Sequence, residues 1–382
     1  MRFGSRQTIR GGIGTVVLCL LAVGFASGQA AQQRPQLAGE VFKNVPALKD
    51  IPVDEFMDTM GMFSAATNMN CTDCHTEDSG SNWANYAKET PLKQTARRMV
   101  LMVNNLNRNN FRAAKLVTCY TCHRGDQKPK AVASLTIQYG VPMEDPNEIE
   151  IFPDPLAPPA AQILDKYIET IGGAQRLAAL TSFAAKGTYE GFDTEQLKVP
   201  VEIYAKAPAQ RTTIVHTPFG DSVRTFDGRA GWISAPDKPM PLMTLTKANL
   251  EGARIDALIS FPAQVKQAFT QWKVGSTVID DRDVRVVQGT NAGQPTPVNL
   301  YFDESGILIR LVRFSETAVG TIPTQIDFSD YRDVAGVKMP FKFIVTWTNG
   351  QATTELSEIQ PNAAIDAARF ARPAPAAIPR LQ

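Results

Sequence analysis

Histidine is scarce in this 382-residue chain, which has only three, His75, His123 and His216. An excess of charge is also missing, since 39 basic residues face 38 acidic ones and leave a net charge of +1. That balance gives no support for a nucleic-acid-binding protein, which usually has a strongly basic face. With 43% hydrophobic and 20% charged residues, the composition is that of a globular protein, and the length predicts more than one domain.

A long apolar run is also missing from the N-terminus. Three arginines within the first ten residues precede the apolar residues 13–25 and the small-residue stretch "ASGQAA". This order is typical of a secretory signal peptide. We therefore expect a signal peptide over residues 1–30, cleavage after Ala30 and export to the periplasm. An uncleaved membrane anchor is the alternative, but the run is shorter than the roughly 20 residues of a spanning helix.

Cysteine is rare, and its placement is specific. Of five cysteines, Cys19 lies in the predicted signal peptide and the other four form two motifs, "CTDCH" and "CYTCH". The residues of the two motifs are Cys71, Cys74 and His75, and Cys119, Cys122 and His123. Four cysteines in an exported protein can indicate disulfide bonds, but a histidine directly after each pair favours another chemistry.

Cys-x-x-Cys-His is the attachment signal of c-type haem. The two thiols add to the porphyrin vinyl groups, and the histidine becomes the proximal ligand of the iron. Two motifs therefore predict two covalently bound haem c groups. A zinc site is one alternative, although one of its cysteine pairs normally lacks a directly following histidine. A thioredoxin-like redox pair is another, but it needs a single motif between a strand and a helix.

The shortage of histidine limits the sixth ligand of each iron. With two histidines assigned as proximal ligands, bis-histidine coordination at both irons is excluded within one chain. The remaining one, His216, lies in the strand-like stretch "TIVHTPFG" and is interpreted as an ordinary strand residue. Methionine is the other common sixth ligand, and it raises the reduction potential.

Methionines occur in a predicted helix ahead of each motif. The stretch "DIPVDEFMDTMGMFSAATN" has helical spacing and contains Met57, Met60 and Met62 before the first motif. A second helix, with Thr90 as N-cap and Pro91 at its first position, contains Met99 and Met102 before the second motif. We expect one methionine per helix to bind iron and the others to pack, as most helical methionines do.

Together these stretches resemble the cytochrome c subunit of photosynthetic reaction centres. The resemblance covers about residues 40–130 and rests on "EFMDTMGMFSAATNMNCTDCH" and on "ARRMVLMVNNLN" followed by "VTCYTCHRG". It implies a mostly α-helical dihaem domain over residues 31–135, with Met60 facing His75 and Met99 facing His123. The family has four haems and a further histidine ligand before the last motif quoted, whereas "RNNFRAAKL" at that place contains no histidine.

The remainder of the chain has a different sequence pattern. Prolines recur through residues 136–160 and predict an extended linker. From residue 161 to 382 a helical stretch broken at Gly172–Gly173 is followed by alternating, β-branched runs, which predict an antiparallel meander. A helical hairpin, "ANLEGARIDALISFPAQVKQAFTQW", interrupts the strands. This half resembles the Lol-type lipoprotein carriers, which implies an antiparallel β half-barrel with capping helices and places the chain in the multidomain α+β class.

These features favour an electron-transfer protein over an enzyme. The expected partner is a redox protein or a membrane electron-transfer complex such as a photosynthetic reaction centre, with no nucleic acid. Two alternatives stay open: a peroxidase-like haem enzyme with one open iron position, and a hydrophobic-ligand or lipoprotein carrier with an accessory haem domain. The Lol-type resemblance also leaves open a lipid or lipoprotein contact through the C-terminal domain and association with a membrane.

Overall fold

The computed structural model describes residues 34–80, 82–140, 149, 151–236, 240–294 and 296–376. The predicted signal peptide and most of the central part of the predicted linker lie outside these residues. From Pro35 onward the chain forms one compact unit. Within the described residues, no helix is both long and apolar enough to cross a bilayer.

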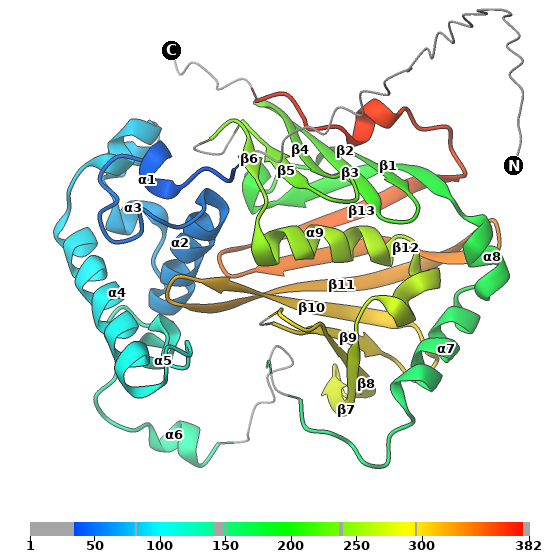
Figure 1. Ribbon diagram of the computed structural model, residues 1–382, viewed down its shortest axis with the longest axis horizontal. Helices are drawn as coiled ribbons and strands as arrows, with labels where there is room; N and C mark the ends of the chain where they lie inside the picture. Colours follow the sequence, from blue (N-terminus) through cyan, green and yellow to red (C-terminus); the bar gives the residue numbers. More distant parts are fainter. Residues whose placement is uncertain are drawn as a thin grey trace, which may run out of the picture. The chain divides into compact units, whose positions relative to one another are not determined.

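The first part of this unit is helical (Figure 1). Its elements are α1 (Ala38–Val41), α2 (Val53–Thr67), α3 (Cys71–Cys74), the 3₁₀ turns η1 (Glu77–Gly80) and η2 (Trp83–Ala87), α4 (Pro91–Asn110), α5 (Cys119–His123) and α6 (Leu135–Gln138). The two long helices begin and end where the sequence predicts. In α4 the Thr90 hydroxyl accepts a hydrogen bond from the Lys93 amide at 3.2 Å, with Pro91 at the first position. Helix α2 ends at Asn68, whose φ of 55° is left-handed.

The second part is one large antiparallel sheet. Its strands are β1 (Ser182–Gly191), β2 (Val199–Lys206), β3 (Gln210–Thr217), β4 (Gly220–Phe226), β5 (Gly231–Ser234), β6 (Met243–Thr244), β7 (Gln271–Ile279), β8 (Arg282–Thr290), β9 (Val298–Phe302), β10 (Leu308–Thr317), β11 (Gly320–Val334), β12 (Val337–Trp347) and β13 (Gly350–Pro361). Their order is β6-β5-β4-β3-β2-β1-β13-β12-β11-β10-β9-β8-β7, and the sheet stays open. Two meanders therefore meet where β1 pairs with β13, and the predicted fold class is confirmed.

Helices cover one face of this sheet, where they form the largest apolar core (Figure 1). They are α7 (Ala160–Thr170), α8 (Ala174–Ala179), α9 (Lys247–Ile259) and the 3₁₀ helix η4 (Pro262–Gln267); a further 3₁₀ turn, η5 (Ala367–Phe370), lies near the C-terminus. Buried side chains such as Leu164 of α7 and Ile255 of α9 pack with strand residues such as Ile203 and Leu311. Each helix covers apolar strand surface that would otherwise face water.

One sequence prediction in this region is wrong in detail. The predicted helical hairpin is one α-helix, α9, followed by the short 3₁₀ helix η4. Pro262 begins η4, and the Ala268 amide donates to the Val265 carbonyl three residues earlier, which is the 3₁₀ pattern. Strands β7 and β8 form a hairpin, in which Asp280 and Asp281 both adopt positive φ, as a two-residue turn requires.

The helical and sheet parts are joined by α2. The Asp54 carboxylate accepts hydrogen bonds from the Thr246 amide at 2.6 Å and from the Thr246 hydroxyl at 2.8 Å, so it caps the N-terminus of α9 from another helix. Next to it, Lys247 Nζ donates to Glu55 at 2.7 Å. One turn on, Thr59 accepts from the Ala318 amide at the end of β10. Helix α2 is therefore fixed to α9 and to the sheet by polar contacts.

We expect Asp54→Ala to lower the free energy of unfolding by about 1–3 kcal/mol, because it leaves the buried Thr246 amide without its acceptor. Urea denaturation of the full chain, with an unchanged m-value, measures this loss. Asp50→Ala is the matched control, since Asp50 makes only an exposed ion pair with Lys49 and its loss should change stability by less than about 0.5 kcal/mol. Equal effects of the two substitutions would contradict the capping role of Asp54.

Candidate functional site

The first motif occupies the short helix α3 and the residue after it. The Asn70 side chain begins this turn by accepting hydrogen bonds from the Thr72 and Asp73 amides, at 2.9 and 3.0 Å. Cys71 is exposed and Cys74 is half-buried. His75 ends the turn, and its Nδ1 lies 3.1 Å from the carbonyl oxygen of Tyr86.

The surroundings of His75 favour its neutral form. Burial, reinforced by the Lys93 ammonium, lowers the pKa of His75, although its hydrogen bond to the Tyr86 carbonyl acts in the opposite direction. The Tyr86 ring lies 4.7 Å from the imidazole, centroid to centroid, and stacks on Trp83 at 5.1 Å. The imidazole is therefore held from one side, and its neutral form is favoured.

The second motif forms α5 in the same way. Thr118 caps the helix through its hydroxyl, which accepts from the Thr121 amide. Cys119 is buried, which raises the pKa of its thiol to about 11, whereas Cys122 is exposed. His123 Nδ1 lies 3.0 Å from the Asp126 carbonyl oxygen. The chain then turns, and the Gly125 amide bonds to the Ala66 carbonyl at the end of α2.

Both histidines share one feature that the sequence cannot show. A carbonyl oxygen only accepts hydrogen bonds, so Nδ1 carries the proton, and in the neutral form of each ring the Nε2 lone pair is available. This is the arrangement that a metal-binding histidine usually has. None of the four motif cysteines forms a disulfide. In the described part of the chain, no three histidine, cysteine or acidic side chains gather into a metal-ion cluster.

The three methionines of α2 point to different surroundings. Met57 lines a cavity beneath the sheet, and Met62 is 3% exposed and packs against Gly320 between β10 and β11. Met60 is partly buried, and Phe56 and Phe63, four residues before and three after it, lie beside it on the helix. Met57 therefore faces the cavity and Met62 is buried, whereas Met60 packs at the margin of an apolar cluster that also contains Val100 of α4 and Cys119 of the second motif.

On α4 the two methionines also differ. Met102 is exposed, whereas Met99 is half-buried and lies one residue before the buried Val100. Leu92 and Leu106, seven residues before and after Met99, extend the same side of the helix. The structure gives no contact between either predicted methionine ligand and its histidine.

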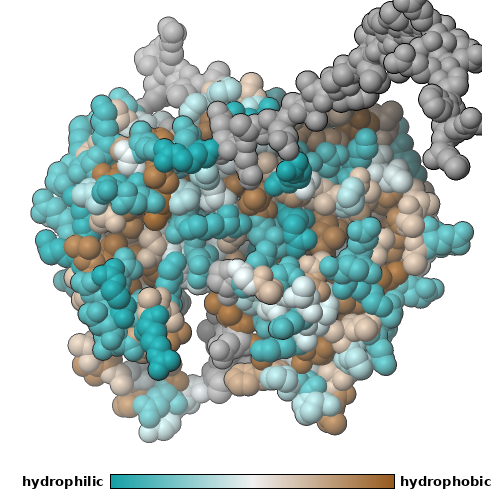
Figure 2. Space-filling view, in the orientation of Figure 1, coloured by the Kyte–Doolittle hydropathy of each residue, from teal (hydrophilic) through white to brown (hydrophobic). Residues whose placement is uncertain are grey.

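Apolar side chains are exposed around the second half of α4 and the second motif. They are Leu101, Met102, Leu106, Phe111, Leu116 and Tyr120. In the space-filling view, apolar patches interrupt the mainly hydrophilic surface over the N-terminal helices (Figure 2). These side chains lie on α4, on α5 and on the segment between them, and exposed apolar side chains in one region often mark a binding surface.

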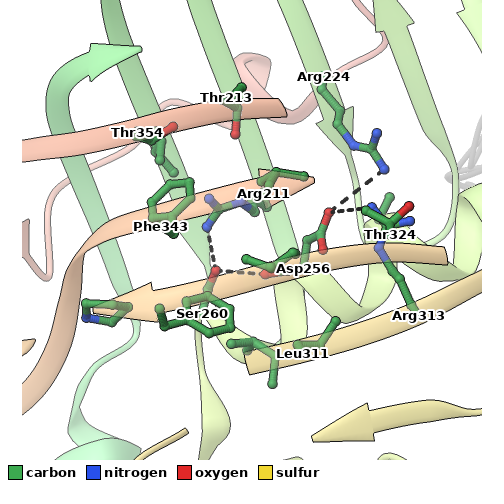
Figure 3. Close-up of a pocket in the computed structure, with 18 of the residues that line it drawn as sticks. Arg211, Thr213, Arg224, Asp256, Ser260, Leu311, Arg313, Thr324, Phe343 and Thr354 are labelled. Carbon is green, nitrogen blue, oxygen red and sulfur yellow. Dashed lines mark hydrogen bonds and ion pairs between the residues drawn. The ribbon is translucent and has the colours of Figure 1, made fainter. Parts of the chain in front are cut away.

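A second feature, not predicted from the sequence, is a cavity of about 450 Å³ between α2, α9 and the covered face of the sheet. Four charged side chains meet in it: Arg211 of β3, Arg224 of β4, Arg313 of β10 and Asp256 of α9 (Figure 3). The sequence contains a signal for this cavity. Arg313 in "LIRLVRFS" is a charged residue at a strand position where the apolar-polar alternation predicts a side chain facing the core.

The α2 residue Asp58 also lines this cavity. Burial raises its pKa to about 7 and the nearby Asp54 adds to the shift, against hydrogen bonding from Asn249 and the charges of Arg313 and Arg224. A carboxyl whose pKa is raised in the folded state contributes stability at low pH and loses it as the pH rises through the folded pKa. The ionised form of Asp58 therefore opposes folding above about pH 7.

We expect Asp58→Asn to make the protein more stable than wild type at pH 8, and to have a much smaller effect near pH 4, where Asp58 is protonated in the folded state and about half protonated in the unfolded state. The difference should grow between about pH 4 and pH 7 and then stay constant. Unfolding free energies at pH 4, 6 and 8 measure it. A difference that is the same at all three pH values would contradict the assignment.

Comparisons with known proteins support the interpretation of the N-terminal part. The family model described as "Photosynthetic reaction centre cytochrome C subunit" matches residues 22–143. Proteins named photosynthetic reaction center cytochrome c subunit match as well. The one from Thermochromatium tepidum is 37% identical over 106 residues, 26% of this chain and 25% of its own. The one from Roseobacter denitrificans is 34% identical over 104 residues, 25% of this chain and 28% of its own.

This chain therefore spans about a quarter of the length of these curated relatives. The C-terminal part matches solved structures. A LolA superfamily protein from Nitrosomonas europaea is 14% identical, with a TM-score of 0.38, over 56% of this chain and 98% of its own. A DUF1329 family protein from Desulfovibrio piger is 9% identical, with a TM-score of 0.40, over the same shares. The N-terminal region of the chain is thus similar to reaction-centre cytochrome c subunits, as the sequence predicts.

Proposed function

We propose that this protein is a periplasmic dihaem c-type cytochrome that relays electrons. Cys71 and Cys74 would attach one haem and Cys119 and Cys122 the other, through thioether bonds. The observation that carries the proposal is the hydrogen bond from Nδ1 of each motif histidine to a backbone carbonyl. It orients both imidazoles with Nε2 available, and similarity to reaction-centre cytochrome c subunits over the same residues supports it.

The residues around the motifs fit a porphyrin. A bound haem would supply a one-electron iron couple. His75 and His123 would be the proximal ligands, and Met60 and Met99 the sixth ligands. The Tyr86 and Asp126 carbonyls fix the orientation of the imidazoles, and the apolar side chains on α4 would cover the porphyrin faces and exclude water. A thioether ligand favours reduced iron, so this set suits an electron carrier at a high potential.

The partner we propose is a redox protein or a membrane electron-transfer complex. Relatives of the N-terminal region are named as subunits of the photosynthetic reaction center, so a complex of that kind is the first candidate. The N-terminal sequence pattern supports export, which brings the chain into the compartment where c-type haem is attached. The sheet part, fixed to α2, would then present the haem-binding helices to this partner.

Carbon monoxide binding tests the proposed relay against the peroxidase-like alternative. If methionine fills the sixth position at both irons, the native reduced protein should leave carbon monoxide unbound while exchanging electrons rapidly with small redox dyes. Absorption spectra of the dithionite-reduced protein, with and without the gas, measure this. A Soret shift that corresponds to half of the haem or more would mean an open iron, and the enzyme reading would replace ours.

A further inference from the structure

The cavity under α9 contains a charged cluster that its own residues leave incompletely paired. Arg224 Nη2 and Arg313 Nη2 lie 3.8 and 3.7 Å from Asp256 Oδ2, too far for hydrogen bonds. Arg224 Nη2, Arg313 Nε and Asp256 Oδ1 are enclosed atoms without a hydrogen-bond partner in the described chain. Figure 3 shows both guanidinium groups directed at Asp256. Such atoms are rare in proteins and destabilise the fold unless something else pairs with them.

The cluster has more positive than negative charge. Arg211, which donates to Ser260 at 2.7 Å, joins the two other arginines, whereas Asp256 and Asp58 are the carboxyl groups beside them. Elsewhere in the lining, Lys338 and Asp193 add one charge of each sign. Three guanidinium groups against two carboxyl groups leave at least one positive charge without a counterion. Burying such a charge is costly unless an anion compensates it.

The fold makes room for this cluster. Arg313 is only 8% exposed and passes next to Gly252 of α9. A Cβ added at Gly252 would lie 2.8 Å from Arg313 Cζ, so a larger residue at this position would displace the guanidinium from its present place. Arg313 is therefore a buried side chain whose guanidinium is enclosed between α9 and the sheet.

The rest of the lining is mainly apolar. Leu311 and Phe343 are close to the cluster in Figure 3, and Phe183, Ile203 and Val345 line the space beyond. A small hydrated anion could pair with the arginines but would leave this surface in contact with water. The volume is in the range of small-molecule sites, which combine apolar walls with a few polar groups.

We propose that the cavity binds a single-chain anionic amphiphile with an oxyacid head, a carboxylate or a phosphate monoester. Its head oxygens accept hydrogen bonds from Arg224 Nη2 and Arg313 Nε, and its alkyl chain lies along the apolar lining. A phosphate monoester also has a hydroxyl to donate to Asp256 Oδ1. The inference stands on the cavity alone and does not depend on the haem sites.

Calorimetric titration of the full-length haem-loaded protein tests this with three probes of equal chain length: laurate, dodecyl phosphate and dodecanol. We expect at least one anion to bind about tenfold or more tightly than neutral dodecanol, as charged hydrogen bonds predict. Comparing laurate with dodecyl phosphate identifies the head group. Dodecanol binding as tightly as both anions, or no binding of either anion, would overturn the proposal.

Substitutions locate the head group. Arg224→Met and Arg313→Met should each remove most of the preference for the anion, whereas Lys338→Met removes one positive charge of the lining outside the cluster and should change it less than about twofold. An unchanged preference in both arginine variants would overturn the assignment. If those variants fail to fold, Asp256→Asn decides. The Asp256→Asn variant keeps both arginines and removes the carboxylate charge that competes with the ligand for them. The affinity for the anionic probes should therefore rise. A lower affinity for both anions would contradict the proposed site.

Discussion

Replacing Cys119 and Cys122 together by alanine should halve the covalently bound haem of this protein. Each thiol pair attaches one porphyrin in our account, and the two motifs fold as separate turns, α3 and α5, each with its own cap. Loss of one pair should therefore leave the other haem in place. The Cys71→Ala/Cys74→Ala variant should also retain one haem, at the second motif.

The haem content per chain, measured from the reduced pyridine spectrum after acid extraction of unattached haem, gives the result. Cys19→Ala is the matched control, because it lies in the predicted signal peptide and should leave two haems per chain. Loss of both haems from each double variant would contradict two independent sites, provided that the secreted protein is recovered in folded form.

Met60→Ala should lower the reduction potential of one haem by on the order of 0.1 V, a fraction of the ~0.8 V range that axial ligands span. The thioether stabilises reduced iron, and its loss leaves water or a weaker ligand in its place. Among the methionines of α2, Met57 faces the cavity and Met62 is buried against Gly320, whereas Met60 is partly buried beside the apolar cluster that contains Cys119 of the second motif.

Met57→Ala is the control for this experiment, since it shortens a side chain on the same helix without touching the proposed ligand. Spectroelectrochemical titration should give two potentials in wild type, one of them shifted in Met60→Ala and both unchanged in Met57→Ala. A changed reduction potential in Met57→Ala alone would assign the iron ligand to Met57, one turn earlier in α2. Met99→Ala should shift the other potential, with Met102→Ala as its control.

The two long helices of the N-terminal part could be predicted because their signals are local. Thr90 and Pro91 define the start of α4, and Asn68 ends α2 in the left-handed conformation that asparagine tolerates. Alternation of apolar residues likewise predicts most strands. The turn at Asp280–Asp281 has a weaker sequence signal, because two aspartates indicate a turn less strongly than Asn-Gly or Asp-Gly.

Contacts between residues that are far apart in the sequence could not be predicted. The pairing of β1 with β13 joins residues more than 150 positions apart, and no short pattern encodes it. The same holds for the contact between Asp54 and Thr246, because a carboxylate that caps a helix nearly two hundred residues away has the same local sequence as one that faces water. The charged cavity follows from these contacts, since α2 forms one of its walls.

The central claim is that one chain holds two haems, one at each motif. Peptide mass mapping of the secreted protein after proteolysis tests it most directly. Our account predicts that the peptides containing "CTDCH" and "CYTCH" both have the mass of peptide plus one haem, with all four thiols consumed. Two motif peptides with unmodified cysteines, or with haem on only one of them, would contradict it.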